Sequence, residues 1–449
     1  MKLDLTWGGL ARAAGGRLTA GAADAPVDSF STDTRALKDG QAFWALKGER
    51  HDAHDHLDAA LAARASGWVV AEGRLKPGAP RPANLVEVPD TLKALQALAR
   101  WHRLRFEVPV VGIAGSNGKT TTKEMLKSIC SLVGPTCATP GNWNNEVGVP
   151  LSLLELDATH RYGIFELAAC RRGEIAELTR IALPTIGVLT NIGPDHLETF
   201  GTIETTFQTN SELAEGLPED GKAVINADDP WLAALETRLG SRAVTYGTGP
   251  RCRVRIENGF LTVDRRRVKL DLKSYGAYSR YNAAAAAAAA LVLGIDADAI
   301  ARGLAAHTPG MLRQEPLTHA SGAVLMLDAY NANPASMKAS VEAFVEQYAQ
   351  RPLTLVLGDM KELGPDSAKF HAELGAWLAA LPLKAVYLAG PEMKAAADAL
   401  AAAKPRFPVE HSLEPASWTT PLKTALTPSD AVLFKASRAM RLEELARSL

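Results

Sequence analysis

The chain has 449 residues, of which 47% are hydrophobic and 22% charged, a composition typical of a water-soluble globular protein. This length exceeds what one hydrophobic core usually holds, so we expect about two or three domains. The formal net charge of −1 provides no overall field for nucleic acid or an anionic membrane surface, which argues against both as partners.

Targeting signals and disulfides are not expected either. Residues 1–16 include Asp4 and lack a continuous apolar core, so we expect no signal peptide there, and no apolar run reaches membrane-spanning length. The 4 cysteines form no Cys-x-x-Cys pair, which argues against a disulfide framework. We therefore expect a cytoplasmic enzyme without membrane insertion, and we expect it to be a monomer.

The first unit that we predict is a small α/β domain over residues 1–84. It ends in a stretch rich in proline and glycine at residues 76–82, which is typical of a boundary. A helix-like pattern over residues 91–105 then leads into the next strand. This helix belongs to a central unit that we expect to span residues 85–314.

Residues 108–113 form an apolar strand that runs into a glycine turn ending in Gly118-Lys119-Thr120, and a helix-compatible run follows. Such a turn aims backbone N–H groups and a helix N-terminus at one point, which suits a phosphate. Lys119 would add a positive charge, and the Thr120 hydroxyl could hold a Mg²⁺ ion bridging two phosphates. Because position 113 is Ile, the spacing fits neither the standard triphosphate loop nor the dinucleotide fingerprint. The Lys-Thr pair nevertheless favours a nucleoside triphosphate site, the alternative being an ordinary glycine turn.

The rest of the central unit alternates apolar runs with helical patterns, and its predicted strands lie at residues 162–167, 185–190 and 223–225. That alternation predicts a doubly wound, mostly parallel sheet. Residues 251–273 break the rhythm with short alternating strands around Asn258-Gly259, which predicts a hairpin. The alanine-rich run at residues 282–294 predicts a tightly packed helix.

A third unit, which we expect to span residues 315–449, repeats the pattern as a Rossmann-like domain. Its predicted strands lie at residues 323–327, 353–357, 385–388 and 431–434. A turn carrying polar residues follows each of them, and open α/β sheets bind ligands just past their strand ends. Three α/β units with the phosphate-binding turn in the middle one predict a cleft that closes by domain motion.

Several motifs, taken together in their order and spacing, resemble the Mur ligase family of ATP-dependent amide ligases. In the central unit the matching stretches are Gly115–Thr121, Gly141–Pro150, Thr190–Glu198 and Asn226–Pro230. Residues 328–337 and 357–364 resemble the branch of the family that adds D-alanyl-D-alanine to UDP-N-acetylmuramoyl-tripeptide. Thr32–Arg35 and Gly48–His54 resemble the nucleotide-sugar-binding domain of that branch.

The resemblance implies a ligase that uses ATP and Mg²⁺ and works through an acyl phosphate in peptidoglycan precursor synthesis. The nucleotide-binding residues that it implies are Gly115, Ser116, Asn117, Gly118, Lys119, Thr120, Thr121, Asn282, Arg313 and Asp328. In this set Arg313 would meet the γ-phosphate, because a planar guanidinium binds phosphate oxygens bidentately and keeps its charge. Asp328 would bind the ribose, and Asn282 would read the adenine unless it is only a helix cap.

The resemblance also implies a catalytic set and a set of metal ligands. The catalytic residues would be Lys119, Glu166, His196 and Arg313, and the metal ligands Thr120, Glu166 and His196. A site that holds two polyanions together needs cations, and neutral histidine is a common metal ligand. From the residues alone, Glu166 could be a solvated acid at a strand end and His196 a structural histidine. The sequence identifies no base for the incoming amine.

Substrate-binding residues are implied in all three units: Thr32, Asp33, Arg35, Asn142, Asn144, Asn145, Tyr330, Asn331, Asn333, Asp359, Lys435 and Arg438. The dipeptide carries a carboxylate and an ammonium group, so its recognition calls for opposite charges close together. Residues at exposed strand ends are polar in any case, which leaves a non-functional interpretation open. The segment with His51, His54 and His56 matches the nucleotide-sugar motif, and we expect no metal there.

The chain departs from the family pattern at four places. Most members carry a lysine that CO₂ modifies to a metal-binding carbamate, but this position is Asn210, so the second metal site must be weaker, differently built or absent. The altered stretch after Glu166 carries Arg171 and Arg172, whose charge could partly replace a lost cation. The other two departures are Tyr278-Ser279 for a His-Asn pair and Ala436 for a glycine.

Two other functions remain open from the sequence. One is a related ligase for another acid, such as folylpolyglutamate synthesis, against which the N-terminal motifs and residues 357–364 argue. The other is a degenerate homologue that binds a nucleotide without catalysis, which Asn210 and the altered stretch at residues 168–172 leave possible. The intact set of Lys119, Thr120, Glu166 and His196 favours catalysis.

Overall fold

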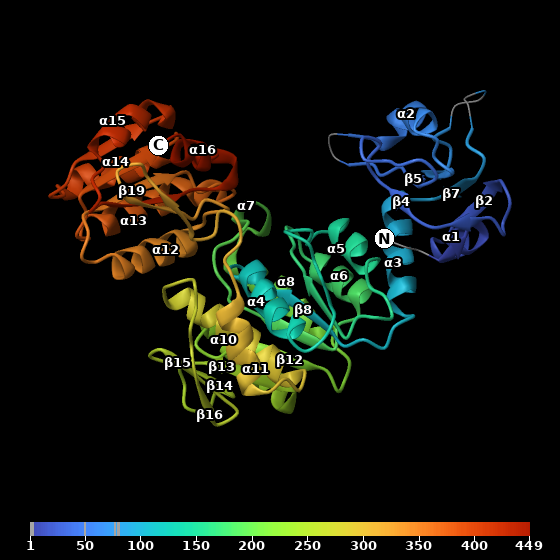
Figure 1. Cartoon of the computed structure of the whole chain (residues 1–449), viewed down its shortest axis with the longest axis horizontal. Helices are drawn as coiled ribbons and strands as arrows, with labels where there is room; N and C mark the ends of the chain where they lie inside the picture. Colours follow the sequence, from blue (N-terminus) through green and yellow to red (C-terminus); the bar gives the residue numbers. More distant parts are fainter. Residues whose placement is uncertain (1–3, 49–50, 76–77, 79–80) are drawn as a thin grey trace.

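The computed structural model describes residues 4–48, 51–75, 78 and 81–449. Its three α/β units follow one another along the long axis of the molecule, with the N-terminal unit at one end and the C-terminal unit at the other (Figure 1). Residues 49–50 of the nucleotide-sugar motif lie outside the described residues, as does most of the predicted boundary at residues 76–82.

The N-terminal unit is built on a sheet with the strand order β2-β7-β6-β5-β4. Its elements are β1 (Leu5–Thr6), α1 (Trp7–Ala13), β2 (Arg17–Ala20), β3 (Pro26–Val27), β4 (Phe30–Ser31), β5 (Ala42–Trp44), α2 (Leu57–Ala62), β6 (Gly67–Ala71) and β7 (Leu85–Val88). Strand β7 pairs with both β6 and β2, and its Leu85, Val86 and Val88 are buried. The N-terminal sheet therefore includes residues beyond the boundary that we expected at residue 84, because these apolar residues complete its core.

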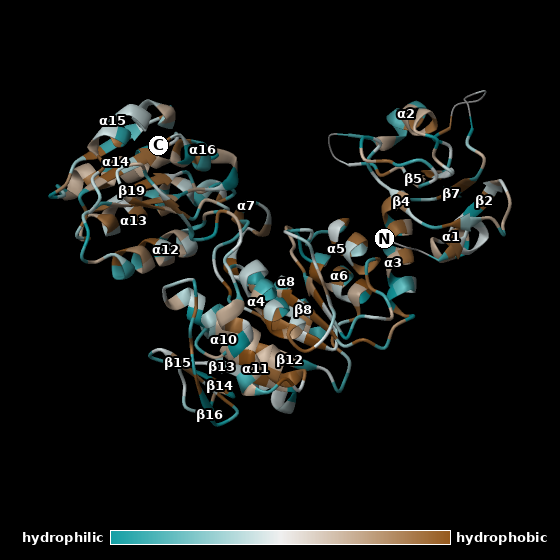
Figure 2. Ribbon diagram, viewed as in Figure 1, coloured by the Kyte–Doolittle hydropathy of each residue, from teal (hydrophilic) through white to brown (hydrophobic). Residues whose placement is uncertain are grey.

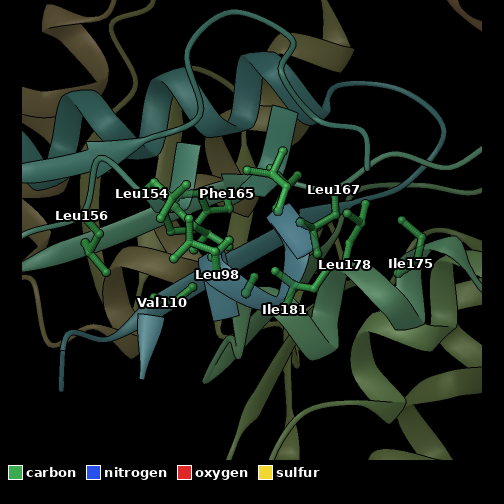
Figure 3. Close-up of a cluster of buried hydrophobic side chains, with 14 of the residues drawn as sticks. Leu98, Val110, Leu154, Leu156, Phe165, Leu167, Ile175, Leu178 and Ile181 are labelled. Atoms are coloured by element: carbon green, nitrogen blue, oxygen red, sulfur yellow. The ribbon is translucent and has the colours of Figure 1, made fainter. Parts of the chain in front are cut away.

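Helix α3 (Thr91–Arg103) joins the N-terminal and central units. Its buried Leu95 and Leu98 belong to one hydrophobic cluster, which extends from Trp7 in the N-terminal unit to Val110 in the central sheet. Figure 3 labels Leu98 and Val110 among the side chains of this cluster. Continuous apolar packing of this kind fixes the helix against both units.

The central sheet confirms the predicted doubly wound architecture, with the strand order β16-β15-β14-β13-β12-β11-β8-β10-β9. Neighbouring strands from β9 to β14 are parallel, and β14, β15 and β16 are antiparallel, which confirms the hairpin around Asn258-Gly259. The strands are β8 (Val110–Ala114), β9 (Thr136–Ala138), β10 (Tyr162–Glu166), β11 (Ile186–Leu189), β12 (Lys222–Asn226), β13 (Ala243–Gly247), β14 (Val254–Glu257), β15 (Phe260–Val263) and β16 (Arg266–Lys269).

Helices cover both faces of the central sheet, so hydrophobic residues gather between the layers (Figure 2). The helices are α4 (Lys119–Ser131), α5 (Gly148–Leu153), α6 (Glu174–Ala182), α7 (Leu197–Phe200), α8 (Ile203–Glu215), α9 (Pro230–Leu239), α10 (Ala277–Val292) and α11 (Ala297–Ala306). Helix α10 starts before the predicted alanine run, and the alanines at 283–290 have no exposed surface. Their small side chains let α10 approach α4 closely, as dense packing requires.

The C-terminal unit is an open sheet with the order β17-β18-β22-β19-β20-β21, parallel except for β17. Its elements are β17 (Glu315–Thr318), β18 (Val324–Leu327), α12 (Pro334–Gln347), β19 (Leu353–Gly358), α13 (Ser367–Leu378), β20 (Ala385–Ala389), α14 (Met393–Ala403), β21 (Val409–Ser412), α15 (Thr419–Ala425), β22 (Ala431–Lys435) and α16 (Leu442–Ser448). Strand β22 lies between β18 and β19, so the turns after these three strands meet at one edge.

Two general properties follow from the described residues. No helix among them is both long and apolar enough to cross a bilayer. The thiols of Cys130, Cys137, Cys170 and Cys252 are all free. Burial raises the pKa of Cys130 and of Cys137 to about 12, so these two thiols stay protonated and unreactive at neutral pH.

Candidate active site

A cavity of about 1320 Å³ lies between the central and C-terminal units. The ends of β12, β11, β8 and β10 form one wall, and the ends of β18 and β22 form part of the other. The predicted site residues that line it are Ser116, Asn117, Gly118, Lys119, Thr120, Thr121, Asn142, Asn144, Asn145, Glu166, His196, Asn282, Arg313, Asp328, Tyr330, Asn331, Lys435 and Arg438. The predicted residues placed elsewhere are Gly115, Asn333, Asp359, Thr32, Asp33 and Arg35.

The glycine turn after β8 directs its last N–H groups into this cavity. Helix α4 begins at Lys119, and the N–H groups of a first helical turn have no partners within the helix. Meanwhile the Lys119 Nζ atom donates to the carbonyls of Gly115 at 2.6 Å and Ser116 at 3.1 Å. A helix N-terminus with a lysine folded over it is an anion-binding arrangement.

Position 118 requires glycine because of its backbone conformation and because of the atoms packed against it. Its φ is +82°, and a Cβ atom placed there would lie 2.2 Å from Oδ1 of Asn282. The buried Asn282 thus packs directly against the turn that should hold phosphate. This contact ties helix α10 to the start of helix α4.

We therefore expect Gly118→Ala to weaken nucleotide binding more than the unfavourable φ alone would. Gly173 provides a matched control, because it also caps a helix at a φ of +91° but has open space where a Cβ would be. Gly173→Ala should cost about 1–2 kcal/mol of stability from φ alone. Gly118→Ala must also displace Asn282, so we expect its ADP affinity to fall at least about tenfold, roughly 1.4 kcal/mol. Calorimetric titration with ADP and thermal unfolding of both variants check this, and equal affinities would contradict it.

Glu166 ends strand β10 and is 1% exposed. Its Oε1 atom accepts hydrogen bonds from Thr120 Oγ1 at 3.0 Å and from Asn144 Nδ2 at 2.7 Å. Its Oε2 atom is buried and has no hydrogen-bond partner among the described residues. A buried carboxylate oxygen without a partner beside a threonine hydroxyl fits a hard cation such as Mg²⁺.

Protein ligands alone do not complete a metal site here. In the described parts of the chain, no group of three or more His, Cys, Asp or Glu side chains is placed to hold a metal ion. Mg²⁺ is usually bound through one or two carboxylates together with substrate phosphates. The donors at Thr120 and Glu166 fit that mode of binding.

His196 follows β11 with a φ of +48° and lies against the C-terminal unit. Its Nδ1 atom is 2.6 Å from Oε2 of Glu362 and 4.0 Å from Sγ of Cys170. Hydrogen bonding to Cys170 and to Glu362 raises the pKa of His196 to about 10, whereas the pKa of Glu362 is lowered by the same pairing. A metal ion at this imidazole would have to displace its proton.

Two further contacts join the C-terminal unit to the glycine turn after β8 and the start of helix α4. An Nη2 atom of Arg313 donates to Thr120 Oγ1 at 3.1 Å, and the guanidinium lies 4.0 Å from the ring centre of Tyr330. Asn333 Nδ2 donates to Asn117 Oδ1 at 2.9 Å. The guanidinium is thereby held beside the position expected for the phosphates, with an aromatic ring behind it.

Asp328 and Lys435 form a buried ion pair at the ends of adjacent strands β18 and β22. The Lys435 Nζ atom lies 3.0 Å from Asp328 Oδ2 and also donates to the carbonyl of Asn331 at 3.1 Å. Ser340 Oγ donates to the same Asp328 oxygen at 2.6 Å. Lys435 is 3% exposed, so in this arrangement it mainly orients Asp328 and the turn after it.

The remaining predicted residues have different surroundings. Asp359 is fully buried, accepting from Lys361 Nζ at 2.8 Å and from the Met393 N–H at 2.9 Å, so its carboxylate holds neighbouring loops together. Arg438 lines the cavity and pairs with Glu443.

In the N-terminal unit, Arg35 holds Asp33 with Nη2 at 2.7 Å from Oδ2. This hydrogen bonding lowers the pKa of Asp33 to about 2. The Arg35 side chain is 89% exposed, so it is open to a ligand. His54 is used internally, because its Nδ1 pairs with Asp52 and its Nε2 accepts from the Ala71 N–H at 3.0 Å.

Three of the four departures from the family pattern lie at or near the cavity. Asn210 is buried behind the glycine turn after β8 and is not part of the cavity lining. Arg171 lines the cavity but points its Nε atom at Glu174 Oε1, 3.1 Å away, which offsets part of its charge. Tyr278 is hydrogen-bonded to Gln314, a cavity residue that the sequence did not single out.

Sequence reasoning also missed Lys123, whose side chain is fully buried behind Glu166. Its Nζ atom donates to the carbonyls of Thr139 at 2.8 Å and Gly141 at 2.7 Å, and it lies 4.0 Å from Glu166 Oε2. The available signal was its spacing, because a residue three positions after Thr120 lies on the same face of the helix.

Comparison with known proteins agrees with this geometry over nearly the whole chain. The model of the Mur ligase middle domain matches residues 113–290, and the Mur ligase, glutamate ligase domain matches residues 312–438. The UDP-N-acetylmuramoyl-tripeptide–D-alanyl-D-alanine ligase of Escherichia coli K12 is 35% identical over 446 residues, covering 95% of this chain and 94% of that protein. The chain belongs to the Mur ligase family.

Other Mur ligases are similar to this chain in sequence and in three-domain fold. The protein of the same name from Bacillus subtilis 168 is 33% identical over 432 residues, covering 94% of this chain and 93% of that protein. A crystal structure of MurF from Acinetobacter baumannii has a TM-score of 0.89 and 31% identity, covering 100% of this chain and 99% of that one. The MurF ligase of Thermotoga maritima, solved in complex with ADP, has a TM-score of 0.81 and 31% identity, covering 94% and 96% of the two chains.

Proposed function

We propose that this Mur ligase adds D-alanyl-D-alanine to UDP-N-acetylmuramoyl-tripeptide in the cytoplasm, giving UDP-N-acetylmuramoyl-pentapeptide, ADP and phosphate. The observation that carries the proposal is the shared cavity, in which a phosphate-binding turn of the central unit faces charged strand ends of the C-terminal unit. Such a cavity holds a nucleotide and a second substrate next to each other. The names of full-length relatives supply the substrates.

The reaction consists of two displacements that meet in this cavity. The tripeptide carboxylate attacks the γ-phosphorus of ATP, the bond to the β-phosphate oxygen breaks, and ADP leaves an acyl phosphate behind. The amine of D-alanyl-D-alanine then attacks the acyl carbon, and the tetrahedral intermediate expels phosphate. The ammonium group of the dipeptide loses its protons on the way, so the products for each ATP are ADP, phosphate, one amide and one proton.

The residues of this chain would hold the charges in place during both displacements. Lys119 and the N-terminus of α4 would bind the phosphates, and Arg313 would meet the γ-phosphate from the other side. Thr120 and Glu166 would hold a Mg²⁺ ion, which would supply charge stabilisation on the phosphate oxygens. Asn282 would bind the adenine and Asp328 the ribose, with Lys435 keeping Asp328 in position.

The substrates would enter from opposite sides of the central unit. Thr32, Asp33 and Arg35 would bind the nucleotide part of the UDP-linked substrate in the N-terminal unit, while Asn142, Asn144 and Asn145 would guide its peptide into the cavity. Tyr330, Asn331 and Arg438 would receive the dipeptide, with Asn333 and Asp359 supporting them from outside the cavity lining. His196 would contribute a ligand to a metal ion once a nucleotide is bound.

An isotope experiment tests both the products and the route. The tripeptide substrate is labelled with ¹⁸O in its reacting carboxylate and incubated with ATP, Mg²⁺ and D-alanyl-D-alanine. We expect the pentapeptide mass and one ¹⁸O atom in each phosphate released, because the carboxylate oxygen stays with phosphorus. Pentapeptide formation with unlabelled phosphate would contradict the acyl phosphate, and no pentapeptide at all would contradict the function.

A further inference from the structure

Asn210 lies on helix α8, directly behind the phosphate loop. Its side-chain Oδ1 atom accepts a hydrogen bond from the Gly115 N–H at 2.7 Å, although the two residues are 95 positions apart in the sequence. Its Nδ2 atom donates to the Thr206 carbonyl, one turn earlier on the same helix, at 2.8 Å. The side chain is therefore held at both ends, and Asn210 is only 7% exposed.

The N–H groups at the beginning of the loop are all engaged by protein atoms. Gly115 donates to Asn210, Ser116 to the Asn191 carbonyl at 2.9 Å, and Asn117 to Asn191 Oδ1 at 3.0 Å. Only the N–H groups from Gly118 onward remain to face a phosphate. The first three contacts thus determine where the phosphate-binding part of the loop begins.

The backbone at Gly115 leaves little freedom to recover a lost contact. Its φ is +130°, and a Cβ atom there would lie 2.2 Å from Oγ1 of Thr190. A buried N–H group that loses its acceptor keeps its desolvation penalty, so the loop would have to move to find a new one. Movement at Gly115 shifts the N–H groups that follow.

We propose that Asn210 is a positioning residue for the phosphate loop and supplies nucleotide affinity rather than a metal ligand. The amide carries no charge, it is outside the described lining of the cavity, and both of its polar atoms are already paired. The inference relies on the proposed function only in that this loop binds the phosphates of ATP.

The test compares the full-length protein with Asn210→Leu and with a matched control on the same helix. Leucine has nearly the size of asparagine but no acceptor for the Gly115 N–H. Thr209→Val is the control, because Thr209 is also buried and its hydroxyl has no hydrogen-bond partner among the described residues. The readouts are ADP binding by calorimetry, hydrogen exchange of residues 110–118, and the KM for each of the three substrates.

We expect Asn210→Leu to weaken ADP binding about tenfold and to raise the KM for ATP by a similar factor. Hydrogen exchange at the loop should become faster, while the KM values for the tripeptide and the dipeptide stay within about twofold, as for Thr209→Val. Unchanged ADP affinity, or an equal loss for all three substrates, would overturn the proposal.

A second variant, Asn210→Asp, keeps the proposal testable if Asn210→Leu does not fold. Asn210→Asp keeps an acceptor for the Gly115 N–H. The amide hydrogens of its residues 110–118 should therefore exchange more slowly than those of Asn210→Leu. If Asn210→Leu does not fold, the reference is the wild type, and Asn210→Asp should exchange at the wild-type rate. Fast exchange in a folded aspartate variant would overturn the proposal. ADP binding is measured without the other substrates, so a failure of the proposed ligase reaction leaves this test intact.

Discussion

Replacing Lys119 by methionine is expected to lower kcat by about 10²–10³-fold, the range measured when one preorganised donor is removed from a developing anion. In the structure, the Lys119 ammonium group lies over the phosphate loop on two carbonyl oxygens. A phosphate would offer this cation a stronger partner than two neutral carbonyls. Methionine keeps the length of the side chain and removes the charge.

Lys127→Met is the matched control for this prediction, because Lys127 is exposed on the same helix. The measurement is the initial rate of phosphate release at saturating substrate, together with the ADP affinity of each variant. Thermal unfolding should show that both variants are folded. A Lys119→Met protein that keeps more than about a tenth of the wild-type kcat would contradict a role on the phosphates.

Replacing Glu166 by glutamine should make the reaction depend on much higher Mg²⁺ concentrations. Glutamine preserves the shape of the side chain and its acceptor for Thr120 and Asn144, but it removes the charge that fits a divalent cation. A metal ion supplies several kcal/mol of charge stabilisation, so we expect kcat at about 1 mM Mg²⁺ to fall by about 10²-fold. Raising the Mg²⁺ concentration should recover part of the rate.

Glu236→Gln is the control for the loss of one acidic residue, since Glu236 is exposed on helix α9. Its Mg²⁺ dependence should match that of the wild type. The measurement is a titration of the initial rate with Mg²⁺ at fixed ATP. If Glu166→Gln needs no more Mg²⁺ than the wild type, Glu166 does not hold the metal.

Local patterns allowed much of the fold to be predicted. The alternation of apolar runs and helical patterns predicted the parallel sheets of the central and C-terminal units. The antiparallel hairpin followed from Asn258-Gly259, because such a pair favours a tight turn. These features depend on residues that are close together in the chain.

Features that depend on distant residues could not be predicted in the same way. The hydrogen bond from Gly115 to Asn210 spans 95 positions, and no local pattern reveals it. The contact of His196 with Glu362 arises only when the C-terminal unit packs against the central unit. The burial of Asp359 arises only when the C-terminal unit forms its own sheet and loops. The polarity of Asp359 fits an exposed substrate contact and a buried ionic anchor equally well.

The C-terminal unit contacts the central unit at three places around the cavity. Arg313 donates to Thr120 and Asn333 to Asn117, both in the glycine turn or at its end, and Glu362 pairs with His196 after β11. On the central side, Asn117, Thr120 and His196 all line the cavity, so we expect a bound nucleotide to change these contacts. Binding would exchange partners there, which is consistent with the predicted closure of the cleft.

Phosphate release by the purified protein tests the central claim most directly. ATP, Mg²⁺, D-alanyl-D-alanine and UDP-N-acetylmuramoyl-tripeptide, with either diaminopimelate or lysine as the third residue, are combined with and without added bicarbonate. We predict turnover that requires both the tripeptide and the dipeptide and that does not respond to bicarbonate, because Asn210 cannot form a carbamate. A protein that binds ADP but releases no phosphate with either tripeptide would contradict the account and identify a nucleotide-binding protein without ligase activity.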